Sequence, residues 1–212
     1  MGKMDVHFSS VTHTWETPDA LYRKVNQHFR FTIDLAASKR NRKCVKYLSA
    51  KQDALSVPWG RGEGRGWCNP PYGRGIASWV AKAFEEVREE KNLESVTLLL
   101  PARTDTGWFQ PLADVAQIRF LPGRLTFEID GKPMLESIES VRARVKKSKT
   151  YKAARETGDR ERAREILARA KQHVQSAPFP SMLATIYATT NSGGERFDPA
   201  MLVWDWKNEP YS

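Results

Sequence analysis

The chain has 212 residues, of which 34 are Lys or Arg and 25 are Asp or Glu, so its formal net charge is +9. Apolar residues make up 40% of the sequence, which is enough for a hydrophobic core and excludes a globally disordered chain. The longest apolar runs are as short as residues 96–100, so we expect no membrane span and no secretory signal. Two cysteines and four scattered histidines give no disulfide framework and no metal-ligand spacing. These features predict one soluble, cytoplasmic domain with an insertion and no metal, and the positive charge favours a polyanionic partner.

Helical and strand-like patterns alternate along most of the chain. Thr17 and Pro18 are typical of a helix start, with Thr17 as the N-cap, and apolar residues then recur at helical spacing from Leu21 to Phe29. The patterns that follow predict, in chain order, strands at 31–35 and 44–48, a Gly-rich loop at 60–66, a helix at 76–91, a strand at 96–100, a helix at 108–113 and a strand at 118–121. This alternation favours an α/β fold with a mostly parallel sheet.

Positive charge is concentrated in one segment. Residues 131–177 contain 13 basic and six acidic side chains. The rest of the chain therefore contains 21 basic and 19 acidic side chains. Residues 125–129 and 182–187 look like two arms of a β-ribbon that carries this segment between them. We therefore expect a nearly neutral body formed by residues 1–130 and 178–212, with residues 131–177 as a basic insertion.

The insertion has the pattern of a helical hairpin. Apolar residues recur at spacings of three and four in residues 135–145 and again in residues 163–174, and Gly158-Asp159 between them provides a helix stop and a helix start. We expect the apolar seam to face inward and six cations to face outward, namely Arg142, Arg144, Lys146, Lys147, Lys149 and Lys152. A solvated hairpin without a ligand is the alternative, but the excess of one charge sign favours contact with phosphates.

Asn69-Pro70-Pro71-Tyr72 is the most informative motif of the chain. Two consecutive prolines fix two φ angles and remove two N–H donors, so the loop is stiff and its carbonyl oxygens are free to accept. The side-chain oxygen of Asn69 and the carbonyl of Pro70 can then accept from one planar amino group, and Tyr72 offers a face for ring stacking. Two fixed acceptors favour the pyramidal, nucleophilic form of an aromatic amine without a strong base. A rigid Pro-Pro turn without chemistry is the alternative.

The motif and its surroundings resemble the phage-type DNA N6-adenine methyltransferase family, which uses S-adenosylmethionine. The resemblance spans residues 15–187 apart from the insertion and is carried by Trp15-Glu16-Thr17-Pro18, Asp34-Leu35-Ala36-Ala37-Ser38, Asp53-Ala54-Leu55, Trp67-Cys68-Asn69-Pro70-Pro71-Tyr72-Gly73, Gly123-Arg124-Leu125-Thr126-Phe127 and Ala177-Pro178-Phe179-Pro180-Ser181. It implies a class I methyltransferase (Rossmann-like) fold: a mostly parallel, seven-stranded sheet with helices on both faces and the basic helical hairpin as an insertion.

The resemblance also implies a cofactor site. The residues that would line it are Thr17, Pro18, Asp34, Ala36, Asp53, Leu55 and Asn69. Thr17 would lie against the methionine end of S-adenosylmethionine, Asp34 would meet its α-amino group, and Asp53 would accept from its adenine amino group. The sequence departs from the family pattern in two places: residues 34–38 lack the glycines of the usual cofactor loop, and no acidic residue ends the strand near residue 47.

Substrate contacts follow from the same resemblance. The two acceptors of the motif would hold the target amine, Pro71 would support the loop, Tyr72 would stack on the flipped adenine, and Phe127 would close its other side. Arg124 and the cations of the insertion would contact the DNA. A stacked base in a duplex is out of reach, so it must be extruded, at a cost of roughly a few kcal/mol.

Purely structural roles stay open for several of these residues: Thr17 as a helix cap, Asp53 as a helix N-cap or surface carboxylate, and Phe127 as a core residue. The function implied is methylation of the N6 amine of adenine in double-stranded DNA. The alternatives are methylation of RNA adenine or of a protein glutamine, or a DNA-binding module without catalysis.

Overall fold

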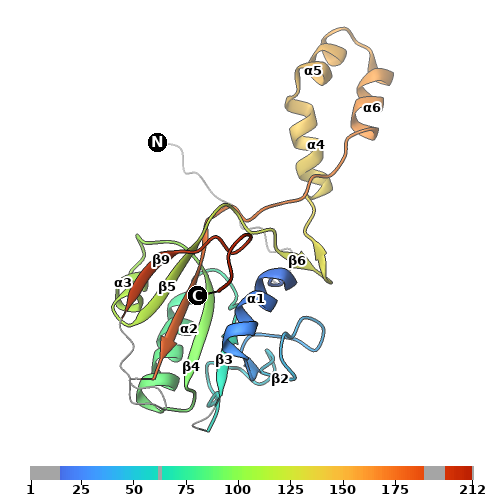
Figure 1. Cartoon of the computed structure of the whole chain (residues 1–212). Coiled ribbons are helices and arrows are strands. Elements are labelled where there is room, and N and C mark those ends of the chain that lie inside the picture. The colour runs from blue at the N-terminus through green and yellow to red at the C-terminus, as the bar shows by residue number, and fades with distance from the viewer. Residues whose placement is uncertain (1–14, 62–63, 189–198, 212) are drawn as a thin grey trace.

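The computed structural model describes residues 15–61, 64–188 and 199–211, so His7, His13 and Gly62 lie outside the described residues. Its centre is a seven-stranded sheet in the order β2-β1-β3-β4-β8-β5-β9 (Figure 1). The strands are β1 (Ile33–Asp34), β2 (Lys46–Tyr47), β3 (Arg65–Cys68), β4 (Ser95–Pro101), β5 (Ala116–Leu121), β8 (Ser181–Tyr187) and β9 (Ala200–Val203). Within this sheet only β8 runs antiparallel to its neighbours. The predicted mostly parallel, seven-stranded sheet is confirmed, and it is compatible with a Rossmann-like fold.

Helices cover both faces of the sheet. Val80 of α2 (Ile76–Phe84) and Leu112 of α3 (Phe109–Ala113) pack in one cluster with Leu98 of β4. Val25 of α1 (Asp19–Phe29) packs in a second cluster with Leu99, the next residue of β4. Successive residues of a strand point to opposite faces, so β4, buried along its whole length, contributes to both clusters.

The start of α1 differs from the sequence prediction. The helix begins at Asp19, so Pro18 occupies the N-cap position, and no side chain caps the helix from within this segment. The Asp19 N–H instead donates to the carboxylate of Glu128, 109 positions away in the sequence (3.3 Å). The prediction that Thr17 is the N-cap is therefore wrong. The distant Glu128 carboxylate, and not a side chain next to the helix, accepts from a free backbone N–H of the first turn.

The predicted helix at 76–91 is shorter than expected. Helix α2 ends at Phe84 and the chain continues as a π-helix, η1 (Glu85–Glu89). Glu86 is only 1% exposed and accepts from the backbone N–H of Trp59 (2.8 Å) and the side-chain amide of Asn92 (2.9 Å). It also pairs with Lys82 (2.7 Å), which gives this buried carboxylate a counter-charge.

The predicted ribbon between 125–129 and 182–187 is wrong. β8 lies between β4 and β5 and is buried on both faces. β6 (Glu128–Ile129) instead pairs with β7 (Lys132–Pro133) through a two-residue turn at Asp130-Gly131, both with positive φ (53° and 70°). A strand buried on both faces favours a central position in the sheet, and an Asp-Gly pair favours a tight hairpin.

Three helices occupy the segment for which the sequence predicts two: α4 (Ile138–Lys147), α5 (Lys149–Glu156) and α6 (Arg160–Ala168). The Ser148 hydroxyl accepts from the Tyr151 N–H (3.3 Å), so the chain starts a new helix there. Val141 and Val145 are buried in the seam, whereas Leu135 is 50% and Ile138 56% exposed, contrary to the predicted inward seam. Figure 1 shows these helices projecting from the sheet as an arm.

The first prediction concerns the sheet core. Leu98→Ala removes a fully buried side chain of β4 and is expected to lower the unfolding free energy by about 2–5 kcal/mol. Leu202→Ala on β9, where the side chain is 50% exposed, is the matched control and is expected to cost less than about 1 kcal/mol. Urea denaturation of both variants checks this, and equal losses would contradict the difference in burial between Leu98 and Leu202.

Candidate active site

The carboxyl ends of the parallel strands bring the predicted site residues to one edge of the sheet. Asp34 ends β1 and stands opposite Trp67 in the register with β3, which ends one residue later at Cys68. The Asn69–Tyr72 motif follows at once. Ligands of open α/β sheets bind at this edge, in the loops that follow the strands.

Asn69 is held by the segment that precedes α1. Its Nδ2 donates to the backbone carbonyl of Trp15 (2.7 Å). Because the amide has one donor and one acceptor end, this bond fixes its orientation and leaves Oδ1 available to another donor. The same segment is held at Glu16, which exchanges two backbone hydrogen bonds with Glu128 (3.1 and 3.0 Å). Thr17 and Pro18 are thereby brought beside the motif.

Tyr72 lies within a cluster of aromatic rings. Trp15 stacks on Phe127 with centroids 5.2 Å apart and an interplanar angle of 28°, and Phe127 is 0% exposed. Tyr72 meets Trp15, Phe127 and Phe179 edge-on at 5.8, 5.8 and 5.4 Å. The Tyr72 hydroxyl donates to the carbonyl of Leu99 (3.2 Å), and burial raises its pKa well above the usual value. In this arrangement Trp15 covers the face of Phe127.

Asp34 is a buried carboxylate, 3% exposed. Its two oxygens accept from the backbone N–H groups of Ala36 (3.3 Å) and Lys43 (2.9 Å). Burial raises the pKa of Asp34, while these two N–H groups and the Lys43 charge oppose that rise. The Lys43 ammonium pairs with Asp19, and Asp34 forms no ion pair within the described residues. Ala36 is half-buried at the start of the loop that these bonds hold.

The loop after β2 is organised separately. Asp53 is exposed, has a positive φ of 49°, and accepts from the Ser56 hydroxyl (2.6 Å). Leu55 is half-buried, and the carbonyl of Ala54 accepts from the indole N–H of Trp59 (2.6 Å). In the part of the chain that the structure describes, no hydrogen bond joins residues 50–58 to Asp34 or to the motif. Asp53 therefore braces a turn in this structure.

The cations of the arm lie away from the motif. Arg142, Lys146, Lys147, Lys149 and Lys152 are exposed. Arg144, by contrast, pairs with Glu136 (3.0 Å) and donates to the carbonyl of Lys171 (3.1 Å), and its hydrogen bond to Glu136 lowers the pKa of that carboxyl. Arg144 therefore joins the two chain segments at the base of the arm. Arg124 is exposed in the loop after β5.

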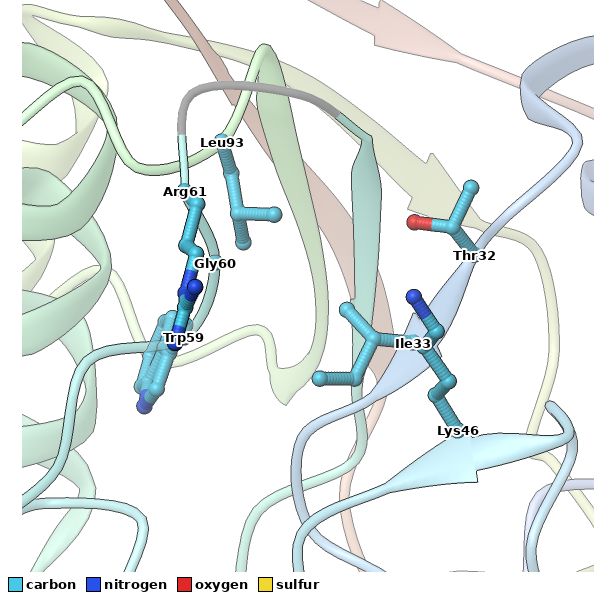
Figure 2. A pocket seen from close by; sticks show the side chains of 7 residues that line it. All are labelled: Thr32, Ile33, Lys46, Trp59, Gly60, Arg61 and Leu93. Carbon is cyan, nitrogen blue, oxygen red and sulfur yellow. The ribbon is translucent and has the colours of Figure 1, made fainter.

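A pocket of about 350 Å³ lies elsewhere on the sheet (Figure 2). It is lined by Thr32, Ile33, Lys46, Trp59, Gly60, Arg61 and Leu93. Ile33 and Lys46 begin β1 and β2, and Leu93 precedes β4, so the pocket opens at the amino ends of these strands. It is therefore on the opposite edge from the Asn69 motif.

Trp15 and Phe179 are the site residues that sequence reasoning missed. Both lie in the stretches that carry the family resemblance, but neither received a role, because their contacts join segments 54 or more positions apart. Across residues 15–61, 64–188 and 199–211, no three or more His, Cys, Asp and Glu side chains gather as a metal site. None of the helices in these ranges has the length and apolar character needed to cross a membrane.

Comparisons with known proteins identify the family of the chain. A model of the family described as DNA N-6-adenine-methyltransferase (Dam) matches residues 7–157. The DNA N-6-adenine-methyltransferase of Escherichia phage T1 is 31% identical over 130 residues, which cover 60% of this chain and about half (52%) of the phage protein. The putative methyltransferase YfdM of Escherichia coli K12 is 35% identical over 63 residues, 27% of this chain and 69% of that protein. Because the family model covers more than half of its residues, the chain belongs to the DNA N-6-adenine-methyltransferase (Dam) family.

Proposed function

We propose that the protein transfers the methyl group of S-adenosylmethionine to the N6 amine of adenine in double-stranded DNA. The observation that carries this proposal is the fixed amide of Asn69, whose Nδ2 is bound to Trp15 so that Oδ1 is left as an acceptor beside Pro70. Family membership and the name of the phage T1 relative support the same reaction. The fold is then a class I methyltransferase fold with residues 131–177 as an inserted arm.

The buried end of β1 fits the cofactor. Asp34 is an almost fully buried carboxylate that lacks an ion pair among the described residues, and the α-ammonium group of S-adenosylmethionine would supply the missing cation. Thr17 is buried (3% exposed) in the segment bound to the motif, and it would face the methionine end. Asp53 and Leu55 would hold the adenine end, with Asp53 exchanging the Ser56 hydroxyl for an amino group. The bound cofactor supplies a methyl group activated by a sulfonium leaving group.

The protein's own contribution to the reaction is positioning and polarisation. Asn69 Oδ1 and the Pro70 carbonyl accept the two hydrogens of the adenine amine, which favours the pyramidal form whose lone pair can attack. Pro70 is buried and Pro71 follows it, so the acceptor loop cannot turn away. No side chain needs to act as a strong base, because the proton is lost to water after the amine has been methylated.

The flipped adenine would lie between Tyr72 and Phe127. The hydrogen bond from Tyr72 to Leu99 holds the Tyr72 ring at the edge of β4. Since Trp15 stacks on Phe127, the entering base would take the place of the Trp15 ring. The exposed cations of the arm would bind the DNA backbone and present the duplex to this edge.

The reaction is tested with labelled S-adenosylmethionine, unmethylated duplex DNA and nucleoside analysis of the product. Asn69→Ala is expected to lower turnover at least about a hundredfold, because one of two fixed acceptors is lost, while the cofactor still binds by calorimetry. Asn208→Ala is the matched control, since it removes an exposed amide that donates to Asp205 (2.8 Å), and it should keep full activity. Label in RNA or protein but not in duplex DNA, or near-full activity of Asn69→Ala, would overturn the proposal.

The role of Asp34 predicts a pH dependence of cofactor binding. Burial raises the pKa of Asp34, and the α-ammonium group attracts only its ionised form. Cofactor affinity is therefore expected to be full above this raised pKa and to fall as the pH drops through it. Calorimetric titration of S-adenosylmethionine between about pH 4.5 and 7 measures this.

Two variants serve as controls for that titration. Asp34→Asn should bind the cofactor weakly with a flat pH profile, whereas Asp114→Asn, which removes an exposed carboxylate after α3, should keep the wild-type profile. An unchanged profile in Asp34→Asn would show that another group responds to pH.

The arm is tested by the salt dependence of DNA binding. In the double variant Lys149→Gln/Lys152→Gln, the slope of log K against log[salt] should fall by about 1 to 2, because each phosphate contact contributes about 0.9. Lys149 lies in the first turn of α5, where a cation opposes the helix dipole, so its loss should not unfold the helix. Lys91→Gln, at the opposite edge of the sheet, is the control. A slope equal to that of the control would remove the arm from the DNA interface.

A further inference from the structure

Three arginines follow the parallel strands β3, β4 and β5 at the edge that carries the motif, with β8 between β4 and β5. Arg74 lies two residues beyond Tyr72 in the loop after β3, Arg103 lies in the loop after β4, and Arg124 lies in the loop after β5. All three side chains are exposed. Among the described residues none of them forms an ion pair, so their charges are not used to hold the fold together.

The strand register brings these loops level with one another. Pro101 at the end of β4 and Leu121 at the end of β5 both pair with Ser181, on opposite sides of β8. The loop after β3 turns back over β4, because the Tyr72 hydroxyl donates to the carbonyl of Leu99. The three loops therefore border the same surface, around the motif and its aromatic cluster.

The composition of the loops after β3, β4 and β5 would allow an anion to come close to the backbone. Residues 73–75, 102–107 and 122–126 contain the three arginines and one acidic residue, Asp105. They also contain four glycines at which an added Cβ would meet no atom of the described residues within 4 Å, namely Gly73, Gly75, Gly107 and Gly123. At Gly60 and Gly66, by contrast, an added Cβ would lie 2.2 and 2.8 Å from its nearest neighbour. The glycines have no side chain that would block the approach of a phosphodiester chain, and the arginine beside them can bind its phosphate.

We propose that Arg74, Arg103 and Arg124 bind the phosphates that flank the target adenine on the methylated strand. This inference rests on the proposed function and assigns the contacts that hold the strand while its base is turned out of the duplex. The assignment to DNA rather than to the cofactor follows from position. Apart from Asn69 of the motif, the candidate cofactor residues lie before α1 and in the loops after β1 and β2, whereas the arginines lie in the loops after β3, β4 and β5.

The position also separates these arginines from the arm. The cations of the arm stand on helices that project from the body (Figure 1), so they bind phosphates at a distance from the target base. The edge arginines surround the site at which the base enters. Guanidinium groups bind phosphate oxygens through two parallel hydrogen bonds, which fix direction as well as distance. A flipped nucleotide needs such fixed points on both sides, because its own stacking is lost.

The test first maps the adenine that the wild-type protein methylates in duplex DNA. Arg74→Gln and Arg103→Gln are then compared with Lys91→Gln in binding to that duplex. Each arginine variant should weaken binding about tenfold and lower the salt slope by about 1, while Lys91→Gln stays within about twofold of wild type. Cofactor affinity and melting temperature should not change, because the side chains are exposed and unpaired.

A second duplex, with neutral methylphosphonate linkages on both sides of the mapped adenine, assigns the contact. Wild type should bind it at least about a hundredfold more weakly than the natural duplex, because the phosphates that pair with all three arginines are neutral, and the arginine variants should show little further loss. Three results would overturn the inference while the methylation activity stands. The arginine variants could lose as much affinity on the neutral duplex as on the natural one, they could bind the natural duplex as tightly as Lys91→Gln does, or they could lose cofactor affinity. If the wild-type protein produces no N6-methyladenine in duplex DNA, both the proposed function and this inference fail.

Discussion

The hydrogen bond from the Asn69 amide to the Trp15 carbonyl is the contact on which the arrangement of the site depends. It joins the segment before α1 to the loop after β3 and fixes which end of the amide remains an acceptor. The ring of the same residue, Trp15, stacks on Phe127, and Thr17 follows two residues later in the segment that this bond holds. A stiff Pro-Pro loop alone would hold the backbone but would leave the amide of Asn69 free to rotate. The motif is therefore complete only together with a segment 54 positions earlier in the sequence.

The second constraint is the burial of charge at the end of β1. Asp34 loses most of its hydration, and two backbone N–H groups replace only part of it, so the pKa of its carboxyl stays raised. The nearby Cys68 thiol shows the effect of this environment, because burial and the Asp34 charge both raise its pKa. Lys43 could neutralise Asp34 but pairs with Asp19 instead. A buried carboxylate without an ion pair among the described residues is suited to a cationic ligand, which is the basis of the role proposed for Asp34.

The sequence predicts those features whose signals are local. The helical spacing of Leu21 and Phe29 locates α1, and strand-like runs separated by helical ones predict a mostly parallel α/β sheet. The number of seven strands, which the family resemblance implies, is confirmed by the structure. Pairing partners are not local. The pattern at 125–129 is consistent with a strand, but nothing in it states that Glu128 pairs across a tight turn and also accepts from the N–H of Asp19. The stacking of Trp15 on Phe127 was missed for the same reason, since it depends on tertiary packing between distant segments. The predicted roles of the individual site residues stay predictions.

The distribution of charge suggests that the arm and the edge of the sheet would have different roles in DNA binding. Most of the net positive charge lies in residues 131–177, outside the body that contains the motif. Charges on a projecting arm raise affinity for any phosphate backbone, but they do not determine which nucleotide meets Asn69. The pairing of Arg144 with Glu136 uses one of these cations to hold the base of the arm, so orientation of the arm competes with DNA contact for the same charges. Under the proposed function, positioning of a single base would come from the loops after β3, β4 and β5, whose three arginines form no ion pair among the described residues.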